Sequence, residues 1–264
     1  MPYTPALALV TGASSGLGAL VARRMAERGT DLVLVARRRD RLDELAGELR
    51  RRHGVTVHPV VMDLGRAGAG PALLEALAAE APGRSPDLVV NNAGFGIYGP
   101  LVENDPEKLE AMLTLNVTAL TSITRAVLEP MVRRGSGTLV NVASTGGFQP
   151  APGLAAYVAT KAYVLHLSEA LWQEVKGTGV RVTALCPGPT STEFFDVAGS
   201  EHGVLGGNVT TPEQVVDALV AALDRRRLPP YLVPDVPNRI QSVAARVLPR
   251  RLALPVAARV MRQS

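Results

Sequence analysis

The sequence contains few of the residues that build disulfides and metal sites. Its 264 residues include one cysteine, Cys186, so no internal disulfide is possible, which agrees with a reducing compartment. Cys186 ends an apolar stretch, and this position favours a buried small residue over a nucleophile. The four histidines are scattered without the spacing of metal ligands. We therefore expect no metal site.

Net charge and long apolar runs are limited as well. The formal net charge is +4, and 25 of the 28 basic residues are arginine, yet no recognisable nucleic-acid-binding module accompanies this charge. No uninterrupted apolar run approaches the roughly 18 to 20 residues that span a bilayer. The first residues lack the basic start and cleavage pattern of a signal peptide. We expect a cytoplasmic protein without a nucleic-acid partner.

What the sequence does contain is a regular alternation of apolar runs and helical patterns. Runs that predict strands lie at residues 6–11, 31–36, 55–61, 87–91, 137–143, 180–186 and 231–233. Helical patterns lie between them at 17–28, 40–53, 70–81, 106–134, 154–176 and 212–223. This alternation predicts an α/β fold, a doubly wound, Rossmann-type parallel sheet of seven strands with helices on both faces. Ligands of such a sheet bind beyond the carboxyl ends of the strands.

The first predicted strand runs directly into the glycine-rich segment GASSGLG. Gly12, Gly16 and Gly18 let the backbone turn tightly and approach a pyrophosphate, and the helix that follows offers free N–H groups and a partial positive charge. A glycine-rich turn alone is often only a turn. Between a first strand and a first helix it predicts a dinucleotide site.

Basic residues stand where NAD-binding versions of this fold carry an acid. The second strand ends in Arg37 and Arg38, and the hydroxyls of Ser14 and Ser15 are expected nearby. Guanidinium and hydroxyl groups suit a 2′-phosphate, so we expect NADP(H); the alternative is a solvated loop in an arginine-rich chain. Asp63, after the third strand, is expected to accept from the adenine amino group, to cap a helix, or both.

A tyrosine and a lysine, Tyr157 and Lys161, lie four residues apart in the helix predicted from Leu154. Residues at this spacing share one helix face, so the ammonium would lie close to the phenol. A nearby positive charge favours the phenolate, and we expect a lowered pKa for Tyr157 that suits a general acid or base. Such a pair is common by chance, and its meaning depends on its neighbours. Ser144 precedes the tyrosine by thirteen residues, and Thr145 competes with Ser144 for the same role.

Several motifs together resemble the short-chain dehydrogenase/reductase family. They are TGASSGLG at 11–18, NNAG at 91–94, Asn116, Ser144, YVATK at 157–161 and PGPTST at 187–192, in the family's order and spacing over about residues 6–223. The resemblance implies that Tyr157 exchanges a proton with a carbonyl or hydroxyl oxygen, which Ser144 holds by a hydrogen bond. It implies that Lys161 lowers the pKa of the tyrosine and holds the nicotinamide ribose, and that Asn116 positions a water in a proton relay to Lys161.

The cofactor site combines these motifs with the glycine turn. Pro187, Gly188 and Thr190 are implied at its nicotinamide end. The complete set that we expect is Gly12, Ser14, Ser15, Gly16, Leu17, Gly18, Arg37, Arg38, Asp63, Leu64, Asn92, Ala93, Gly94, Tyr157, Lys161, Pro187, Gly188 and Thr190. Less specific interpretations stay open for the catalytic set, because Asn116 could simply interrupt a helix and Ser144 could simply end a strand.

All four phenylalanines of the chain fall near the predicted site. Phe95, Phe148, Phe194 and Phe195, together with Ser144, form the expected substrate pocket, which indicates a lipophilic ketone or aldehyde. Aromatic residues in loops often only anchor the loop, which is the alternative. The family places a mobile substrate lid at about residues 190–211. We take residues 1–235, with this lid, as one catalytic domain.

Residues 236–264 form a basic, amphipathic C-terminal extension. From Arg225 onward there are nine arginines and a single acid, Asp235. An apolar helical stripe is expected at Ile240, Val243, Ala244, Val247 and Leu248, and a second short helix at 254–261. Three roles compete: packing against the body or a sister subunit, covering the substrate pocket, and contact with an anionic membrane surface.

The leading functional hypothesis is an NADP(H)-dependent carbonyl reductase or alcohol dehydrogenase. One alternative is an isomerase or dehydratase that uses the same tyrosine and lysine, and another is a redox sensor that binds NADP(H) without turnover. Family resemblance implies a homodimer or homotetramer assembled through the helices at 154–176 and 212–223.

Overall fold

A parallel sheet of seven strands forms the centre of the protein. The computed structural model describes residues 2–190, 209–247, 251 and 254. The strands lie side by side in the order β3-β2-β1-β4-β5-β6-β7, and every pairing is parallel. Their bounds are β1 Leu7–Thr11, β2 Asp31–Ala36, β3 Val57–Val61, β4 Leu88–Asn91, β5 Gly137–Val142, β6 Val180–Leu185 and β7 Tyr231–Leu232. The predicted doubly wound sheet is confirmed.

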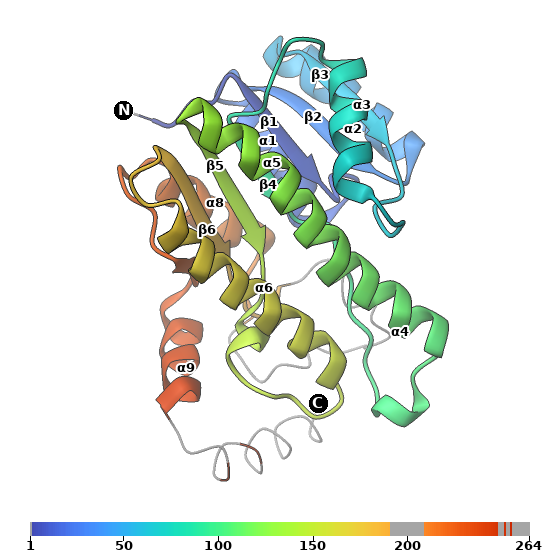
Figure 1. Ribbon diagram of the computed structural model, residues 1–264, viewed down its shortest axis with the longest axis vertical. Coiled ribbons are helices and arrows are strands. Elements are labelled where there is room, and N and C mark those ends of the chain that lie inside the picture. Colours follow the sequence, from blue (N-terminus) through green and yellow to red (C-terminus); the bar gives the residue numbers. More distant parts are fainter. Residues whose placement is uncertain (1, 191–208, 248–250, 252–253, 255–264) are drawn as a thin grey trace.

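Helices cover both faces of this sheet (Figure 1). They are α1 Gly16–Ala26, α2 Arg39–His53, α3 Ala69–Glu80, α4 Pro106–Leu113, α5 Leu120–Arg134, α6 Ala155–Glu174 and α8 Pro212–Leu223. One core layer joins α1, α2 and α8 to the sheet, and the other joins α3, α5 and the end of α6 to the opposite face. Because both faces are covered, the central strands read as continuous apolar runs rather than alternating ones.

The predicted motifs converge at the carboxyl edge of the sheet. In a parallel sheet all strands end on the same side, so the segments after β1, β4, β5 and β6 lie along one rim. Hydrogen bonds fix these segments to one another. Thr11 Oγ1 accepts the backbone N–H groups of Asn92 and Ala93, and Pro187 O accepts the N–H of Thr145.

One helical stretch, Pro106–Arg134, is long and apolar enough to cross a membrane by length and composition. The sequence criterion, an uninterrupted apolar run, did not predict this stretch because polar residues interrupt it. Its mean hydropathy is nevertheless high enough for a membrane span. Two hydrogen bonds fix its second half to the sheet: Thr124 Oγ1 donates to Asn141 Oδ1 on β5, and Asn91 Nδ2 on β4 donates to Leu120 O. The stretch is a core helix of the α/β fold.

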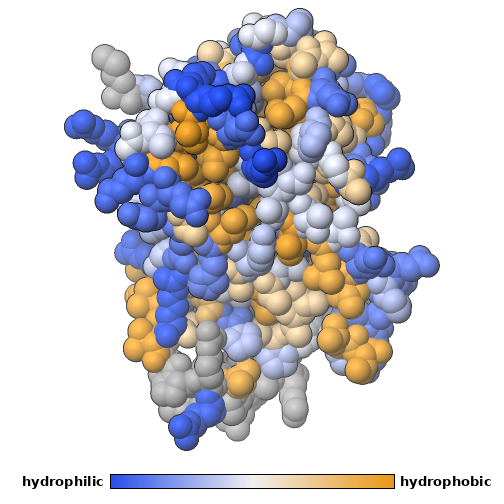
Figure 2. Space-filling model, viewed as in Figure 1, coloured by the Kyte–Doolittle hydropathy of each residue, from blue (hydrophilic) through white to orange (hydrophobic). Residues whose placement is uncertain are grey.

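The C-terminal helix α9, Val236–Val247, packs with the face opposite to the expected one. Its apolar stripe is exposed, with Ile240, Val243 and Val247 at 65%, 49% and 78% of their accessible surface, whereas Asn238 and Ser242 are buried. The polar face is the buried one because it makes specific contacts. Ser242 Oγ donates to Asn238 O at 2.8 Å within the helix, and the side chain of Asn238 packs against Gly188. Apolar surface gathers at the lower left of Figure 2, over α9. Leu248 and, apart from Leu254, the second short helix lie outside the described residues.

Candidate active site and cofactor site

The structure brings Ser144, Tyr157 and Lys161 together at the carboxyl edge of the sheet. Ser144 follows β5 and caps the short helix η3, Thr145–Phe148, by accepting the N–H of Gly146. Tyr157 and Lys161 lie one turn apart on α6. The hydroxyls of Ser144 and Tyr157 are hydrogen-bonded, and the three residues are only 5%, 6% and 6% exposed. A thirteen-residue sequence gap is therefore closed into one buried cluster.

Ser144, and not Thr145, carries the hydroxyl that meets the tyrosine. Thr145 begins η3, and its backbone N–H donates to Pro187 O at 2.8 Å. This bond ties the segment after β5 to the segment after β6. Ser144 is therefore the better candidate of the two for contact with a reacting oxygen.

Lys161 is a buried amine whose Nζ donates to Val142 O at 2.9 Å. The same Nζ lies 5.8 Å from the centre of the Tyr157 ring. Burial lowers the pKa of Lys161 to about 8, because the charged form loses its hydration. At neutral pH the amine is thus protonated, but its charge is poorly stabilised by the protein alone.

The expected lowering of the pKa of Tyr157 is wrong for this structure. Burial raises the pKa of Tyr157 above its ordinary value, and the hydrogen bond with Ser144 offsets only part of this effect. Desolvation is the largest influence on this pKa, and the ammonium of Lys161 lies 5.8 Å from the ring centre. The phenol therefore keeps its proton at neutral pH.

Asn116 occupies a widened turn in the stretch between α4 and α5. This turn, η2, spans Thr114–Ala119 and is π-helical, a geometry often found at functional sites. The buried amide of Asn116 is held on both sides, because Nδ2 donates to Phe95 O at 2.8 Å and Oδ1 accepts from Phe95 N at 3.1 Å. Nδ2 also lies 3.2 Å from the hydroxyl of Thr160, which donates to Tyr157 O. Sequence reasoning assigned no role to Thr160, although it directly precedes Lys161.

Gly94 must lack a side chain for this arrangement to exist. A Cβ at this position would lie 2.8 Å from Asn116 Oδ1 and 3.5 Å from Lys161 Nζ. The glycine of NNAG therefore gives the asparagine room beside the lysine, in addition to any contact with a cofactor.

The glycine turn after β1 has no room for a side chain at Gly12 or Gly18. Gly12 and Gly16 have φ values of 65° and 54°, and a Cβ on Gly18 would lie 2.4 Å from Gly12 O. Asn92 fills the space behind the turn, with Nδ2 donating to Thr11 O at 2.9 Å. Its amide therefore supports the turn from behind.

The first turn of α1 carries no acidic residue, so its N–H groups and partial positive charge suit a pyrophosphate. Leu17 belongs to this turn and packs against the core with its side chain partly buried.

Arg38 gathers the two serines of the glycine turn. Its Nη2 lies 2.8 Å from Ser15 Oγ and 3.1 Å from Ser14 Oγ, so a guanidinium and two hydroxyls share one place beside the end of β2. This donor set fits a 2′-phosphate. Arg37 is exposed, and of the two arginines it is Arg38 that the structure joins to both serines.

After β3, Asp63 forms a hydrogen bond within a turn, whereas Leu64 is buried in the core. The helix-cap alternative for Asp63 is wrong, since α3 begins at Ala69 and Gly68 is its N-cap. Asp63 instead accepts the N–H of Gly65 at 3.0 Å within a turn and lies 3.7 Å from Arg66 Nε. Leu64 is buried in the core, so only its backbone can face a cofactor.

The segment after β6 is held from two sides. Thr190 Oγ1 donates to Gly188 O at 2.9 Å, and Thr190 forms a parallel bridge with Thr210. A Cβ on Gly188 would lie 2.3 Å from Asn238 Nδ2 of α9. Cys186 at the head of the segment is fully buried, and burial raises the pKa of its thiol, so it is not a nucleophile.

The expected substrate residues separate in the structure. Phe95 lies partly buried against the apolar cluster of Met112, Ala151, Leu154, Tyr157 and Val158. Phe148 is buried elsewhere, with its ring 5.3 Å from that of Tyr231 in an edge-to-face arrangement. Phe194, Phe195 and most of the lid at 190–211 lie outside the described residues.

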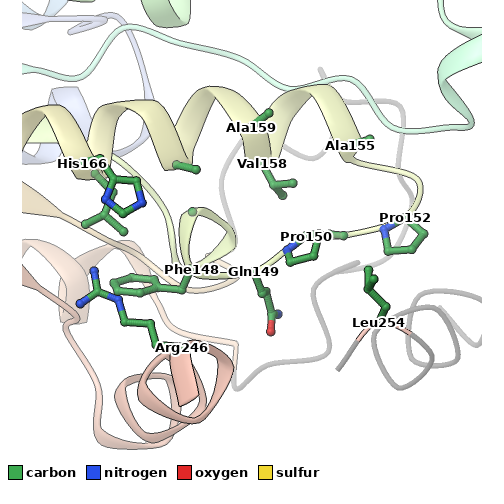
Figure 3. Close-up of a pocket in the computed structure, with 14 residues that line it drawn as sticks. Phe148, Gln149, Pro150, Pro152, Ala155, Val158, Ala159, His166, Arg246 and Leu254 are labelled. Atoms are coloured by element: carbon green, nitrogen blue, oxygen red, sulfur yellow. The ribbon is translucent and has the colours of Figure 1, made fainter. Parts of the chain in front are cut away.

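Phe148 also lines a cavity of about 610 Å³ between the segment after η3, α6 and α9 (Figure 3). The described residues around this cavity include Pro150, Val158, Arg246 and Leu254 but neither Ser144 nor Tyr157. This cavity joins Phe148 to α6 and α9, and the pairing of Phe148 with Ser144 in one substrate pocket stays a prediction.

Comparison with known proteins agrees with this geometry. The family model for short chain dehydrogenases matches residues 6–202. Sulfoacetaldehyde reductase 2 of Chromohalobacter salexigens is 40% identical over 231 residues, which cover 86% of this chain and 90% of that protein.

Two solved structures have the same fold. A short-chain dehydrogenase from Sphingobium yanoikuyae in complex with NADPH is 38% identical, with a TM-score of 0.80 over 95% of each chain. A bulky-bulky ketone specific alcohol dehydrogenase from Comamonas testosteroni is 32% identical, with a TM-score of 0.77 over 96% of this chain and 95% of that one. With a matching family model, relatives that bind NADPH, and a guanidinium–hydroxyl cluster that suits a 2′-phosphate, this chain belongs to the short-chain dehydrogenase family and is an NADP(H)-dependent oxidoreductase.

Proposed function

We propose that the protein reduces a lipophilic ketone or aldehyde to an alcohol, with Tyr157 as the general acid. The observation that carries this proposal is the buried hydrogen bond between the hydroxyls of Tyr157 and Ser144, one helical turn from Lys161. A carbonyl oxygen placed against both hydroxyls accepts a hydrogen bond from Ser144 and a proton from Tyr157. NADPH supplies the hydride to the carbonyl carbon, and the two transfers together give the alcohol.

The protonation states are compatible with reduction. Burial raises the pKa of Tyr157, so at neutral pH the phenol holds the proton that reduction requires. The lowered pKa of Lys161, about 8, leaves its ammonium charged at neutral pH. As the phenol gives up its proton, this ammonium stabilises the phenolate that forms, and the amide of Asn116 beside it keeps the segment after β4 in place.

Apolar surroundings favour a lipophilic substrate. The ring of Tyr157 belongs to a cluster with Met112, Ala151 and Leu154, against which Phe95 packs. Sulfoacetaldehyde, the substrate named for one relative, is small and anionic, whereas the Comamonas testosteroni enzyme is named for bulky ketones. The apolar cluster suits a bulky ketone better than sulfoacetaldehyde, because a sulfonate would lose its hydration there.

A substrate panel tests the proposal. NADPH oxidation should be fastest with bulky aryl or alkyl ketones and aldehydes, and slow with sulfoacetaldehyde. Turnover of sulfoacetaldehyde alone would overturn the lipophilic assignment. NADPH binding without turnover on any carbonyl would instead support the redox sensor, and conversion of a substrate without net NADPH oxidation would support an isomerase or dehydratase.

The extension is proposed to contact an anionic membrane surface. The exposed residues Ile240, Val243 and Val247 form an outward apolar stripe on a helix that also carries the exposed Arg239. Flotation with anionic liposomes should recover the full chain but not the double variant Ile240→Ser, Val243→Ser. If neither floats, and the variant alone loses a dimer in light scattering, the stripe is a subunit contact instead.

A further inference from the structure

We propose that Asn238 and Arg246 of α9 position the nicotinamide end of the cofactor site from behind. We call this pair the α9 clamp. The inference rests on the proposed function and on the expectation, implied by the family resemblance, that Pro187, Gly188 and Thr190 receive the nicotinamide end of NADPH. It assigns the C-terminal extension a part in cofactor binding that its sequence did not predict.

The first contact of the clamp is between Asn238 and Gly188. A Cβ on Gly188 would lie 2.3 Å from Asn238 Nδ2 and 2.7 Å from its Cγ, so the amide packs directly against the glycine backbone. Asn238 is only 1% exposed. The glycine at this point is therefore required by the side chain behind it, and the asparagine sets how far the segment can retreat from the site.

The asparagine is itself fixed at the start of α9. Asp235 Oδ2 accepts from Asn238 Nδ2 at 2.8 Å, and Asp235 Oδ1 accepts from its backbone N–H at 2.9 Å. The carbonyl of Asn238 accepts the hydroxyl of Ser242 one turn later. Because these bonds fix the rotamer, the amide is a rigid support rather than a mobile side chain.

The second contact holds the segment that follows Ser144. Arg246 pairs with Glu169 of α6 at 2.8 Å, and its guanidinium lies 4.8 Å from the ring of Phe148 and 4.9 Å from that of Tyr231. Figure 3 shows Arg246 beside Phe148 at one end of the cavity. Phe148 ends η3, the short helix that Ser144 caps, so the arginine acts on the catalytic serine through this ring.

The two contacts act on one unit. The segments after β5 and β6 are joined by the bond from Thr145 N to Pro187 O at 2.8 Å. Asn238 supports the β6 side of this unit and Arg246 the β5 side, both from α9. The clamp thus sets the distance between the nicotinamide-binding segment and Ser144, whereas the site of the 2′-phosphate is built from Arg38 and the glycine turn.

This separation gives the test. Affinities for NADPH and for adenosine 2′,5′-bisphosphate, which has no nicotinamide, are measured by titration for wild type, Asn238→Ala and Arg246→Leu. We expect each variant to lose about tenfold in NADPH affinity and to keep its affinity for the bisphosphate. Arg246→Lys, which retains a charge for Glu169 but not the planar stacking, should fall between wild type and Arg246→Leu.

Controls on the same helix separate positioning from general damage. Arg239→Gln and Ile240→Ser change exposed residues of α9 and should leave both affinities unchanged. Unchanged NADPH affinity in folded Asn238→Ala and Arg246→Leu, or equal losses for both ligands, would overturn the inference. If Arg246→Leu fails to fold, Asn238→Ala and Arg246→Lys decide. A wild type that binds the bisphosphate but not NADPH would refute the proposed function itself.

Discussion

At the scale of single residues, the site depends on burying groups that water would otherwise stabilise. Tyr157 and Lys161 are each 6% exposed. Burial disfavours the charged form of each side chain, so it raises the pKa of the phenol and lowers the pKa of the amine. The neutral phenol carries the proton that the reduction of a carbonyl group requires. The poorly stabilised ammonium has the opposite character, because it favours any negative charge that appears beside it.

Lys161→Met should stabilise the folded protein at pH 7. The folded pKa of Lys161 is about 8, below the value of a solvated lysine, so the buried charge lowers stability at pH values under 8. This cost disappears as the pH rises through 8 towards the pKa of the unfolded chain. We expect a gain on the order of 2 kcal/mol at pH 7, less than the full shift because Val142 O loses its donor.

Thermal and urea unfolding at pH 7 and pH 10 measure this effect. The difference between Lys161→Met and wild type should shrink at pH 10. Lys176→Met is the control, because Lys176 is exposed and its change should alter stability little at either pH. A variant less stable than wild type at pH 7 would contradict the assigned cost of burial.

Arg38→Ala should raise the Michaelis constant for NADPH at least tenfold and leave that for NADH nearly unchanged. The reason is the loss of a charge-assisted contact to the 2′-phosphate, worth roughly 1.5 to 3 kcal/mol. Arg37→Ala is the matched control, because both arginines are exposed and it is Arg38 that bonds Ser14 and Ser15. Equal effects of the two substitutions on both cofactors would show that the cluster does not read the phosphate.

At the scale of elements, the glycine turn brings the backbone at Gly12 and Gly18 so close together that a side chain has no room at Gly18. Gly18→Ala should weaken NADPH binding strongly and destabilise the fold, because its Cβ would lie 2.4 Å from Gly12 O. Gly47 in the middle of α2 is a control: a Cβ there meets only the mobile end of Arg51, at 3.1 Å.

Gly47→Ala should gain about 0.5 to 1 kcal/mol from helix propensity and bind NADPH normally. Isothermal titration with NADPH and thermal unfolding measure both variants. If the Gly18→Ala protein binds NADPH as tightly as wild type, the turn does not approach the cofactor.

The strands and helices of the body were predictable because their signals are local. Short apolar runs, such as Leu32 to Ala36, have the length of strands covered on both faces, and helical patterns separate them throughout. The orientation of α9 was not, because its inward face is chosen by single contacts. Asn238 against Gly188 and Arg246 against Phe148 outweigh the apolar stripe, and no periodicity encodes such pairs.

At the scale of the whole molecule, topology explains why the site could largely be predicted. Parallel strands end on one side, so motifs that follow β1, β4, β5 and β6 must meet, however far apart they lie in the chain. Distances and protonation states do not follow from topology. The pKa of Tyr157 depends on how completely helices and loops exclude water, and the spacing of tyrosine and lysine predicted the wrong direction for it.

The same topology separates the adenosine end from the reacting end. Arg38 follows β2, and β1 and β4 lie between this strand and β5, whose end leads to Ser144. The clamp residues of α9 contact the segments at the second of these ends. Changes near Arg38 should therefore affect the choice of cofactor, and changes at Asn238 and Arg246 should affect turnover and the nicotinamide end.

The central claim is that the phenol of Tyr157 supplies the proton for carbonyl reduction, and one pair of variants tests it most directly. Tyr157→Phe removes the hydroxyl that bonds Ser144, while Tyr163→Phe on the same helix removes an exposed hydroxyl that bonds Thr121. With the best ketone of the panel and saturating NADPH, kcat/KM should fall at least a hundredfold in Tyr157→Phe and stay within about twofold in Tyr163→Phe. Full carbonyl reduction by folded Tyr157→Phe would contradict the account.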